Sequence, residues 1–418
     1  MLNSSKRLTA LVGLFFVFTS LGCATYQGKI GGARQSLERG EYQKALDDLE
    51  PLASTDNRDQ LVYLLDYGTA LQVAGRLDES NKTFMKADRL ADLVDYHSLS
   101  KISGSLILNE EMSQYKGDTF EKIFINAYIA MNFLEMGKLD DALVEARRIN
   151  EKYLKYRSDE KKNFEMNSFS KYLSALIWEA NRNYDDAYIA YQEAYKIDPS
   201  IPMLQEDLIR SAKNARRMDT YKDWKKKFPS VVENPNWYDK QYGELVILHQ
   251  QGWGPRKMPA QNEYRLPELI PTRSNVTKSL LMIEGESVGS GQGYLSKEVY
   301  DVEQAAMQTL KEDYGILIAK RVAGIATKAV VSDQIAQQDK TLGQLAWIAM
   351  NIADRADLRQ WSFLPQTIQL IRVPLKPGKY KIKLLGTDEA GRPITNVSLE
   401  REVEVKAGTK KFVVWRTF

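Results

Sequence analysis

The stretch from Ser168 to Pro199, SFSKYLSALIWEANRNYDDAYIAYQEAYKIDP, decides the fold that the sequence predicts. Its small and large apolar residues fall at the spacings of two helices joined by a short turn, with small residues where the helices touch and larger ones filling the groove between them. One such pair cannot bury its own apolar face, so neighbouring pairs that stack on it are expected. The positions that carry the pattern are Ala175, Trp178, Tyr184, Ala187, Tyr191, Ala194 and Pro199.

This pattern resembles a tetratricopeptide repeat, and further copies turn at Gly40, Gly75 and Gly137. Glycine suits the turn between two helices because it tolerates unusual backbone dihedral angles. Arg182 takes the glycine position in the stretch 168–199, which departs from the pattern. The interval from Gly75 to Gly137 leaves room for an inserted helix or loop around residues 95–115. An ordinary helical bundle with accidental alanines is the alternative.

A chain of 418 residues exceeds one typical core, so two or three domains are expected. We predict a mainly α protein: an N-terminal α-solenoid of tetratricopeptide-like repeats, followed by an α+β domain that ends in an antiparallel β-sheet. The predicted domains are the repeats over 33–229, a strand and proline-rich connector over 230–275, and the α+β domain over 276–418. The last helix pair of the repeats is expected within 201–228.

The period of the apolar residues changes from about four to two beyond Trp361, which indicates a change from helices to strands. A helix over 316–338 is interrupted too often by charged residues to span a membrane. The expected strands lie at 243–249, 276–284, 367–373, 379–385, 394–405 and 411–416, and the expected helices at 297–313, 316–338 and 343–357.

Residues 1–22 predict a secretory signal, because Lys6 and Arg7 precede a short apolar run. Residues 19–23 resemble the lipobox of bacterial lipoproteins, in which Cys23 becomes the lipidated first residue. The usual leucine position holds Ser20, and a plain signal with a stray thiol is the alternative. The resemblance implies a lipid anchor and, because Ala24 is not Asp, sorting to the outer membrane facing the periplasm. Residues 23–32 are expected to form a flexible tether.

The second half resembles an uncharacterised family of bacterial lipoproteins that join helical repeats to such a tail. The segments that carry the resemblance are GELVILHQQGWGPRK from Gly243, the alanine-rich helix near 320 and ADLRQWSFLPQTIQLIRVPLKPGKY from Ala356. The resemblance covers most of the mature chain, and residues 357–365 are its most specific part. It implies no assigned chemistry, but members encoded beside small lipoproteins that resemble activators of peptidoglycan synthases hint at cell-wall synthesis.

Catalysis has little support in the sequence. The chain has two histidines, His97 and His249, and one cysteine. These are few of the residues that a zinc site or a catalytic triad requires. The glycine-rich segment 289–293 lacks the Gly-Lys-Ser/Thr ending of a phosphate loop. The acidic pairs 140–141 and 185–186 fit the amino ends of helices. We expect no enzyme activity, no cofactor and no metal.

The charge of the chain is nearly balanced, with a formal net charge of +3, and this gives no basis for a nucleic-acid partner. Solenoids of this class bind through the first helix of each pair, along the concave face. The candidates for that partner-binding groove are Thr69, Gln72, Met131, Glu135, Tyr172 and Glu179.

Arg359 and Trp361 form a possible second contact in the tail. A planar Arg beside a large aromatic side chain can dock a carboxylate or a peptide. The alternative has Trp361 buried under the sheet and Arg359 paired with Asp357.

The sequence therefore predicts a non-enzymatic outer-membrane lipoprotein that acts as a scaffold or assembly factor in the periplasm. It would hold another envelope protein or further copies of itself. One alternative is a regulator of peptidoglycan synthesis or cell-wall binding. An enzyme that acts through the tail is a third hypothesis.

Overall fold

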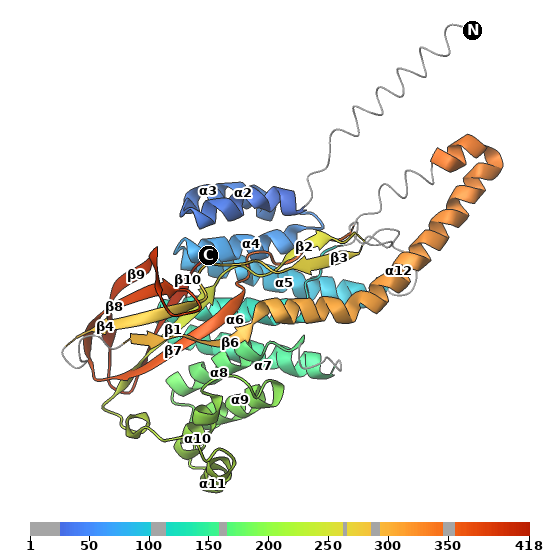
Figure 1. Cartoon of the computed structure of the whole chain (residues 1–418). Coiled ribbons are helices and arrows are strands. Elements are labelled where there is room, and N and C mark those ends of the chain that lie inside the picture. The colour runs from blue at the N-terminus through green and yellow to red at the C-terminus, as the bar shows by residue number, and fades with distance from the viewer. Residues whose placement is uncertain (1–25, 102–113, 159–164, 262–265, 286–292, 346–355) are drawn as a thin grey trace.

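The computed structural model describes residues 26–101, 114–158, 165–261, 266–285, 293–345 and 356–418. The described residues of its N-terminal half form a stack of five helix pairs, which confirms the predicted tetratricopeptide-like repeats (Figure 1). The pairs are α2 (Tyr26–Glu38) with α3 (Tyr42–Ser54), α4 (Gln60–Val73) with α5 (Leu77–Lys101), α6 (Thr119–Glu135) with α7 (Leu139–Ser158), α8 (Ser168–Ala180) with α9 (Tyr184–Ile197), and α10 (Leu204–Asn214) with α11 (Met218–Lys227).

The turn inside each pair uses the same backbone conformation, whichever residue stands there. Gly40, Gly75 and Gly137 have φ of 74°, 77° and 73°, in the left-handed region that glycine enters without strain. Arg182 and Arg216 take the same place with φ of 61° and 56°. The departure at Arg182 therefore changes the residue and keeps the turn.

The first helix of each pair lies inside and the second lies outside. Every residue of α6 from Phe120 to Asn132 is buried, whereas α11 has no buried residue. An inside position of this kind requires a helix that is apolar nearly all round, and α4, α6 and α8 meet that requirement.

One expectation about the repeats is wrong, and another is tested only in part. Residues 26–32 belong to helix α2, whose Tyr26 and Ile30 are buried, so this part of the predicted tether is ordered against the fold. The long interval between Gly75 and Gly137 begins with an extended α5, which runs over 25 residues to Lys101. The rest of the predicted insertion, 102–113, lies outside the described residues.

In the C-terminal half, the described strands form two four-stranded sheets and a two-stranded hairpin. The first sheet has the order β10 (Lys410–Arg416), β1 (Gly243–Gln251), β7 (Thr367–Leu375), β6 (Lys297–Asp301). The second has the order β5 (Gly293–Leu295), β4 (Lys278–Glu284), β8 (Gly378–Thr387), β9 (Pro393–Val405). Strands β2 (Arg256–Pro259) and β3 (Pro267–Ile270) form the hairpin.

Strand β1 lies within 230–275, where the sequence predicted a strand at 243–249 and a proline-rich connector. It is a central strand, antiparallel to β7 and parallel to β10, so the first sheet is mixed, whereas every pairing in the second sheet is antiparallel, as predicted for the end of the chain. Successive side chains of a strand point to opposite faces. Leu245 and Ile247 enter a core between the two sheets, whereas Val246 and Leu248 enter the core shared with the repeats. The first sheet thus joins both halves of the protein.

One helix replaces the two that were expected over 297–313 and 316–338. Residues 297–301 form strand β6, and α12 (Val302–Gln338) then runs unbroken for 37 residues and projects away from the body (Figure 1). Residues 340–345 are helical, and 346–355 of the expected third helix lie outside the described residues. Among the helices described, none is both long and apolar enough to cross a membrane.

Candidate functional site

The inner side of the repeats is covered by the first sheet and by the segment 357–364, hereafter the docking segment. All six predicted groove residues lie at this junction. Five of them are buried, and the side chain of Glu135 is only 16% exposed. The expectation of an open groove is therefore wrong for this structure, because the chain's own tail fills it.

The middle of the junction is a polar contact between glutamines. The side-chain amide of Gln250 on β1 donates to Oε1 of Gln72 at 2.8 Å and lies 3.8 Å from the sulfur of Met131. Glu135 accepts from the backbone N–H of Val414 on β10 at 2.6 Å and pairs with Arg401. These predicted groove residues therefore contact the sheet of the same chain in place of a separate partner protein.

One end of the junction is an aromatic socket for Trp361. Its indole N–H donates to Oγ1 of Thr69 at 2.9 Å, and its ring centroid lies 5.0 Å from Tyr128 and 5.6 Å from Phe84. Trp361 is 2% exposed. A buried Trp needs both apolar contact area and a hydrogen-bond acceptor, and the repeats supply both.

Arg359 is held beside the socket by two carboxylates. It forms a two-point contact with Asp357, at 2.8 and 2.7 Å, and a third contact at 2.8 Å with Asp59 of the repeats. The predicted alternative, in which Arg359 pairs with Asp357, is confirmed. Trp361 is buried as that alternative expected, but inside the repeats and not under the sheet.

Two further carboxyl groups, those of Glu121 and Asp66, lie at the socket, and neither forms an ion pair with any described residue. Glu121 accepts from the backbone N–H of Trp361 at 2.8 Å and from the hydroxyl of Tyr115 at 2.6 Å. Burial, with the nearby charge of Asp118, raises the pKa of Glu121 to about 7. Asp66 accepts from the backbone N–H of Phe363 at 3.1 Å, and burial raises its pKa well above the usual value. Both side chains serve as acceptors for the docking segment.

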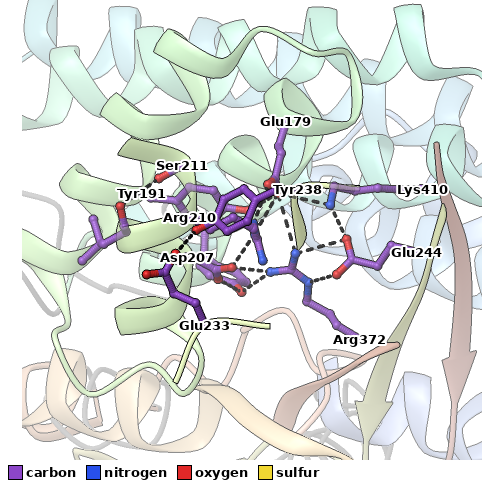
Figure 2. A network of polar contacts seen from close by, with 12 residues as sticks. Glu179, Tyr191, Asp207, Arg210, Ser211, Glu233, Tyr238, Glu244, Arg372 and Lys410 are labelled. Carbon is purple, nitrogen blue, oxygen red and sulfur yellow. Dashed lines mark hydrogen bonds and ion pairs between the residues drawn. The ribbon is translucent and has the colours of Figure 1, made fainter. Parts of the chain in front are cut away.

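The other end of the junction is an ionic network, shown in Figure 2, that joins α8 and α10 to the sheet. Arg372 of β7 contacts Asp207 at 2.6 Å and Glu244 at 2.7 Å. Arg210 contacts Glu179 at 2.8 Å and Asp207 at 2.6 Å. Lys410 of β10 contacts Glu179 at 3.2 Å and also pairs with Glu244.

The network is balanced, with three carboxylates facing three cations, and tyrosines complete it. Tyr172 donates to Asp207 at 2.5 Å, and Tyr191 donates to Glu179 at 2.9 Å. Burial opposes the charge of Glu179, but Arg210, Lys410 and Arg372 outweigh it and lower its pKa to about 2. Buried ions need this kind of matched pairing and hydrogen bonding. The network therefore fixes how the sheet sits on the repeats.

A cavity of about 670 Å³ lies between α12, the loop before α6 and the docking segment. Its walls combine apolar side chains such as Phe120 and Leu364 with charged ones such as Asp118, Lys257 and Arg359. In the part of the chain that the structure describes, no group of three or more His, Cys, Asp or Glu side chains is placed to hold a metal ion.

The remaining candidates from the sequence have structural positions or lie outside the described residues. His249 is buried in β1, bonded to Thr417 at 2.9 Å and stacked on Trp415, and burial lowers its pKa to about 3. The acidic pairs 140–141 and 185–186 lie in the first turns of α7 and α9, as expected for helix ends. His97 lies in α5. Cys23 and most of the segment 289–293 lie outside the described residues.

The sequence analysis did not predict that side chains of the tail are the partners of the groove residues. Arg372 interrupts the apolar strand TIQLIRVPL, and a charged residue in such a strand needs a buried counter-charge. That signal could have predicted an ionic partner. It could not have named Asp207 and Glu244, because they lie 165 and 128 residues away in the sequence.

No family model matches the chain, and no curated protein matches it. Solved structures with a similar arrangement include MamA from Desulfovibrio magneticus RS-1, which is 17% identical, with 47% of this chain and 88% of that chain covered and a TM-score of 0.30. A kinesin light chain with nearly identical TPR-like repeats from Podospora anserina is 10% identical, with 49% and 92% covered and a TM-score of 0.32. Similarity at this level shows nothing about function, and the repeats are established by their helices and turns.

Proposed function

We propose that the protein is a non-enzymatic, lipid-anchored interaction scaffold of the bacterial outer membrane, facing the periplasm. It recruits another envelope protein, or further copies of itself, through the outer layer of its repeats. The anchor in this proposal is Cys23. Support for a scaffold comes from the repeat fold and from the structural roles of the buried charged groups described above.

The observation that carries the proposal is the difference between the two sides of the repeats. The inner side is filled by the tail, so a partner has access to the outer layer, which consists of α3, α5, α7, α9 and α11. Each of these helices exposes at least one large apolar side chain: Tyr42, Leu93, Val144, Leu154, Ile189 and Met218. Single exposed apolar residues are common on protein surfaces, but their recurrence on every outer helix gives a repeat protein an extended contact surface.

Photo-crosslinking in cells tests the proposal. A photoreactive amino acid at Val144, which is 43% exposed on α7, should capture one discrete envelope protein or a second copy of the chain. The matched control has the same amino acid at Tyr172, which is fully buried. Position 172 should give only adducts within the chain.

Two results would contradict the proposal. Absence of any adduct from positions across the outer layer would remove the proposed surface. Capture of another protein from position 172 would mean that the tail leaves the groove and that the inner side is the binding surface after all.

The anchor is tested separately. Cys23→Ser should abolish the incorporation of a labelled fatty acid into the protein, because one cysteine carries the whole proposed lipid attachment. A variant that still incorporates the fatty acid would contradict the anchor without touching the scaffold.

A further inference from the structure

Helix α12 exposes a long apolar surface that no other described part of the chain covers. Val322 is 49% exposed and Val330 is 59% exposed, although the helix contacts the body along its other side. The exposed residues form the outward face of α12, which consists of Ile316, Ile318, Val322, Ile325 and Val330 with the alanines 319, 326 and 329. An exposed apolar surface of this length marks a contact with another molecule or a membrane.

The two sides of α12 differ in character over residues 316–332. Leu317, Arg321, Gly324 and Lys328 line the cavity. Positions 318, 322, 325 and 329 follow the three- and four-residue spacing of one helix stripe, and all four are exposed and apolar. The helix is therefore amphipathic in this part, with its apolar side turned away from the protein.

The charges of this part of α12 have one sign. Residues 314–332 contain three basic residues, Lys320, Arg321 and Lys328, and no acidic residue. Arg321 and Lys328 line the cavity and interact within the fold, and Lys328 is only 4% exposed, so these two charges lie on the inner side of the helix. No acidic residue of this part would repel an anionic membrane surface, and burial of the apolar face is expected to carry the contact.

The start of the described chain lies beside the same cavity. The side-chain amide of Gln27 donates to the backbone carbonyl of Leu358 at 3.2 Å, and the hydroxyl of Tyr26 lies 2.6 Å from the carbonyl oxygen of Gln360. Gln360 and α12 form walls of one cavity. Tyr26 follows Cys23 by three positions in the sequence, and three residue steps span at most about 11 Å. A lipid on Cys23 would hold this part of the protein against a bilayer.

We propose that the outward face of α12 lies in the headgroup region of the membrane that holds the anchor, with phospholipid as its contact. This location rests on the proposed lipid on Cys23. The helix lies on the surface and does not cross, in agreement with the finding that no described helix is suited to span a membrane. Anchor and helix together would fix the orientation of the repeats relative to the membrane.

A vesicle experiment tests the contact without the lipid anchor. The chain from residue 23 with Cys23→Ser is mixed with vesicles of phosphatidylethanolamine and phosphatidylglycerol, and bound protein is separated by flotation. Val322→Ser with Ile325→Ser should lower the partition coefficient by about ten-fold or more, because both side chains leave the apolar face. The matched control, Val232→Ser with Leu295→Ser, changes two exposed apolar residues elsewhere and should bind like the parent chain.

A label on the helix supplies a second measurement. Since the chain has one cysteine, the Cys23→Ser protein accepts a single new thiol. An environment-sensitive fluorophore on Ala326→Cys should shift to shorter wavelength when vesicles are added, whereas the same label on Val232→Cys should not. Circular dichroism of each variant shows whether the fold is retained.

Three outcomes would overturn the proposal: a parent chain that does not float with anionic vesicles, a double variant that floats as well as the parent, or a label at 326 that does not shift. A concentration-dependent dimer that the double variant loses, without vesicle binding, would assign the outward face to a second copy of the chain. Because these tests require neither a lipid on Cys23 nor an envelope partner, they can fail while crosslinking from Val144 succeeds.

Discussion

The two ends of the junction between repeats and tail bury carboxyl groups in opposite ways. At the Trp361 end, burial raises the pKa of Glu121 to about 7, and this side chain accepts hydrogen bonds from a backbone N–H and a tyrosine. At the network end, Arg210, Lys410 and Arg372 overcome the effect of burial and lower the pKa of Glu179 to about 2. The same residue type is thus favoured as a neutral acid at one end and as an anion at the other.

The difference shows how one interface can combine an ionic contact that fixes the register of the two halves with an aromatic contact whose acids respond to pH. A balanced ionic network fixes register strongly, because loss of one member leaves an unpaired buried charge. The aromatic socket depends on packing and hydrogen bonds, and its acids respond to pH. The following substitutions compare how much the ionic network and the aromatic socket each contribute to stability.

Arg372→Met should have the largest effect. It removes one of three cations and leaves Glu244 and Asp207 short of a partner, which we expect to lower the free energy of unfolding by about 3–5 kcal/mol. Urea denaturation at neutral pH measures the change. The control is Lys383→Met, which breaks the exposed pair with Glu400 and should cost less than about 1 kcal/mol. Equal losses for the two variants would show that the network does not join the halves.

The pH dependence of stability should differ between the two ends. The folded-state pKa of Glu121 is about 7, against an ordinary value of 4.5, so its contribution is fully present below pH 4.5 and is lost as pH rises through 7. The loss should approach about 3 kcal/mol. Glu179 acts in the opposite sense: its contribution is present above pH 4.5 and is lost as pH falls toward 2.

Glu121→Gln isolates the first of these effects. The variant is neutral at every pH, so its free energy of unfolding should change less between pH 4.5 and pH 7.5 than that of the wild-type protein. Urea denaturation at the two pH values gives the comparison. An unchanged pH dependence would assign the effect to another group, for which Asp66 is the first candidate.

Trp361→Phe should have the smallest effect. It keeps an aromatic ring in the socket but removes the hydrogen bond to Thr69, at an expected cost of about 1–2 kcal/mol. Thr69→Val leaves the indole N–H without its acceptor and should cost a similar amount. In the double variant the two losses should overlap, and full additivity in denaturation experiments would argue against the bond.

The helices and turns of the repeats could be predicted because their signals are local. The spacing of alanines and the residues at the turns report on contacts within one pair, and even Arg182 takes the dihedral angles that the pattern requires. Most of the later strands were predictable for the same reason, since alternation along a strand is visible in a short window.

The junction could not be predicted in the same way, because its contacts join residues far apart in the sequence. Trp361 and Thr69 are 292 residues apart, and Arg401 and Glu135 are 266 apart. The six groove candidates were correctly placed on the inner side of the repeats. Their occupant was missed, since nothing in a local pattern distinguishes a groove that awaits a partner from one that the same chain fills.

The hydrogen bonds between α2 and the docking segment also constrain the order in which the protein folds. Gln27 and Leu358 are 331 residues apart, so the first helix finds its final neighbours only after most of the polypeptide is present. Long-range closure of this kind slows folding, and until it occurs the apolar inner helices remain exposed to aggregation. Repeats produced without the tail would lack the segment that covers their inner helices. We therefore expect the repeats and the tail to fold as one cooperative unit.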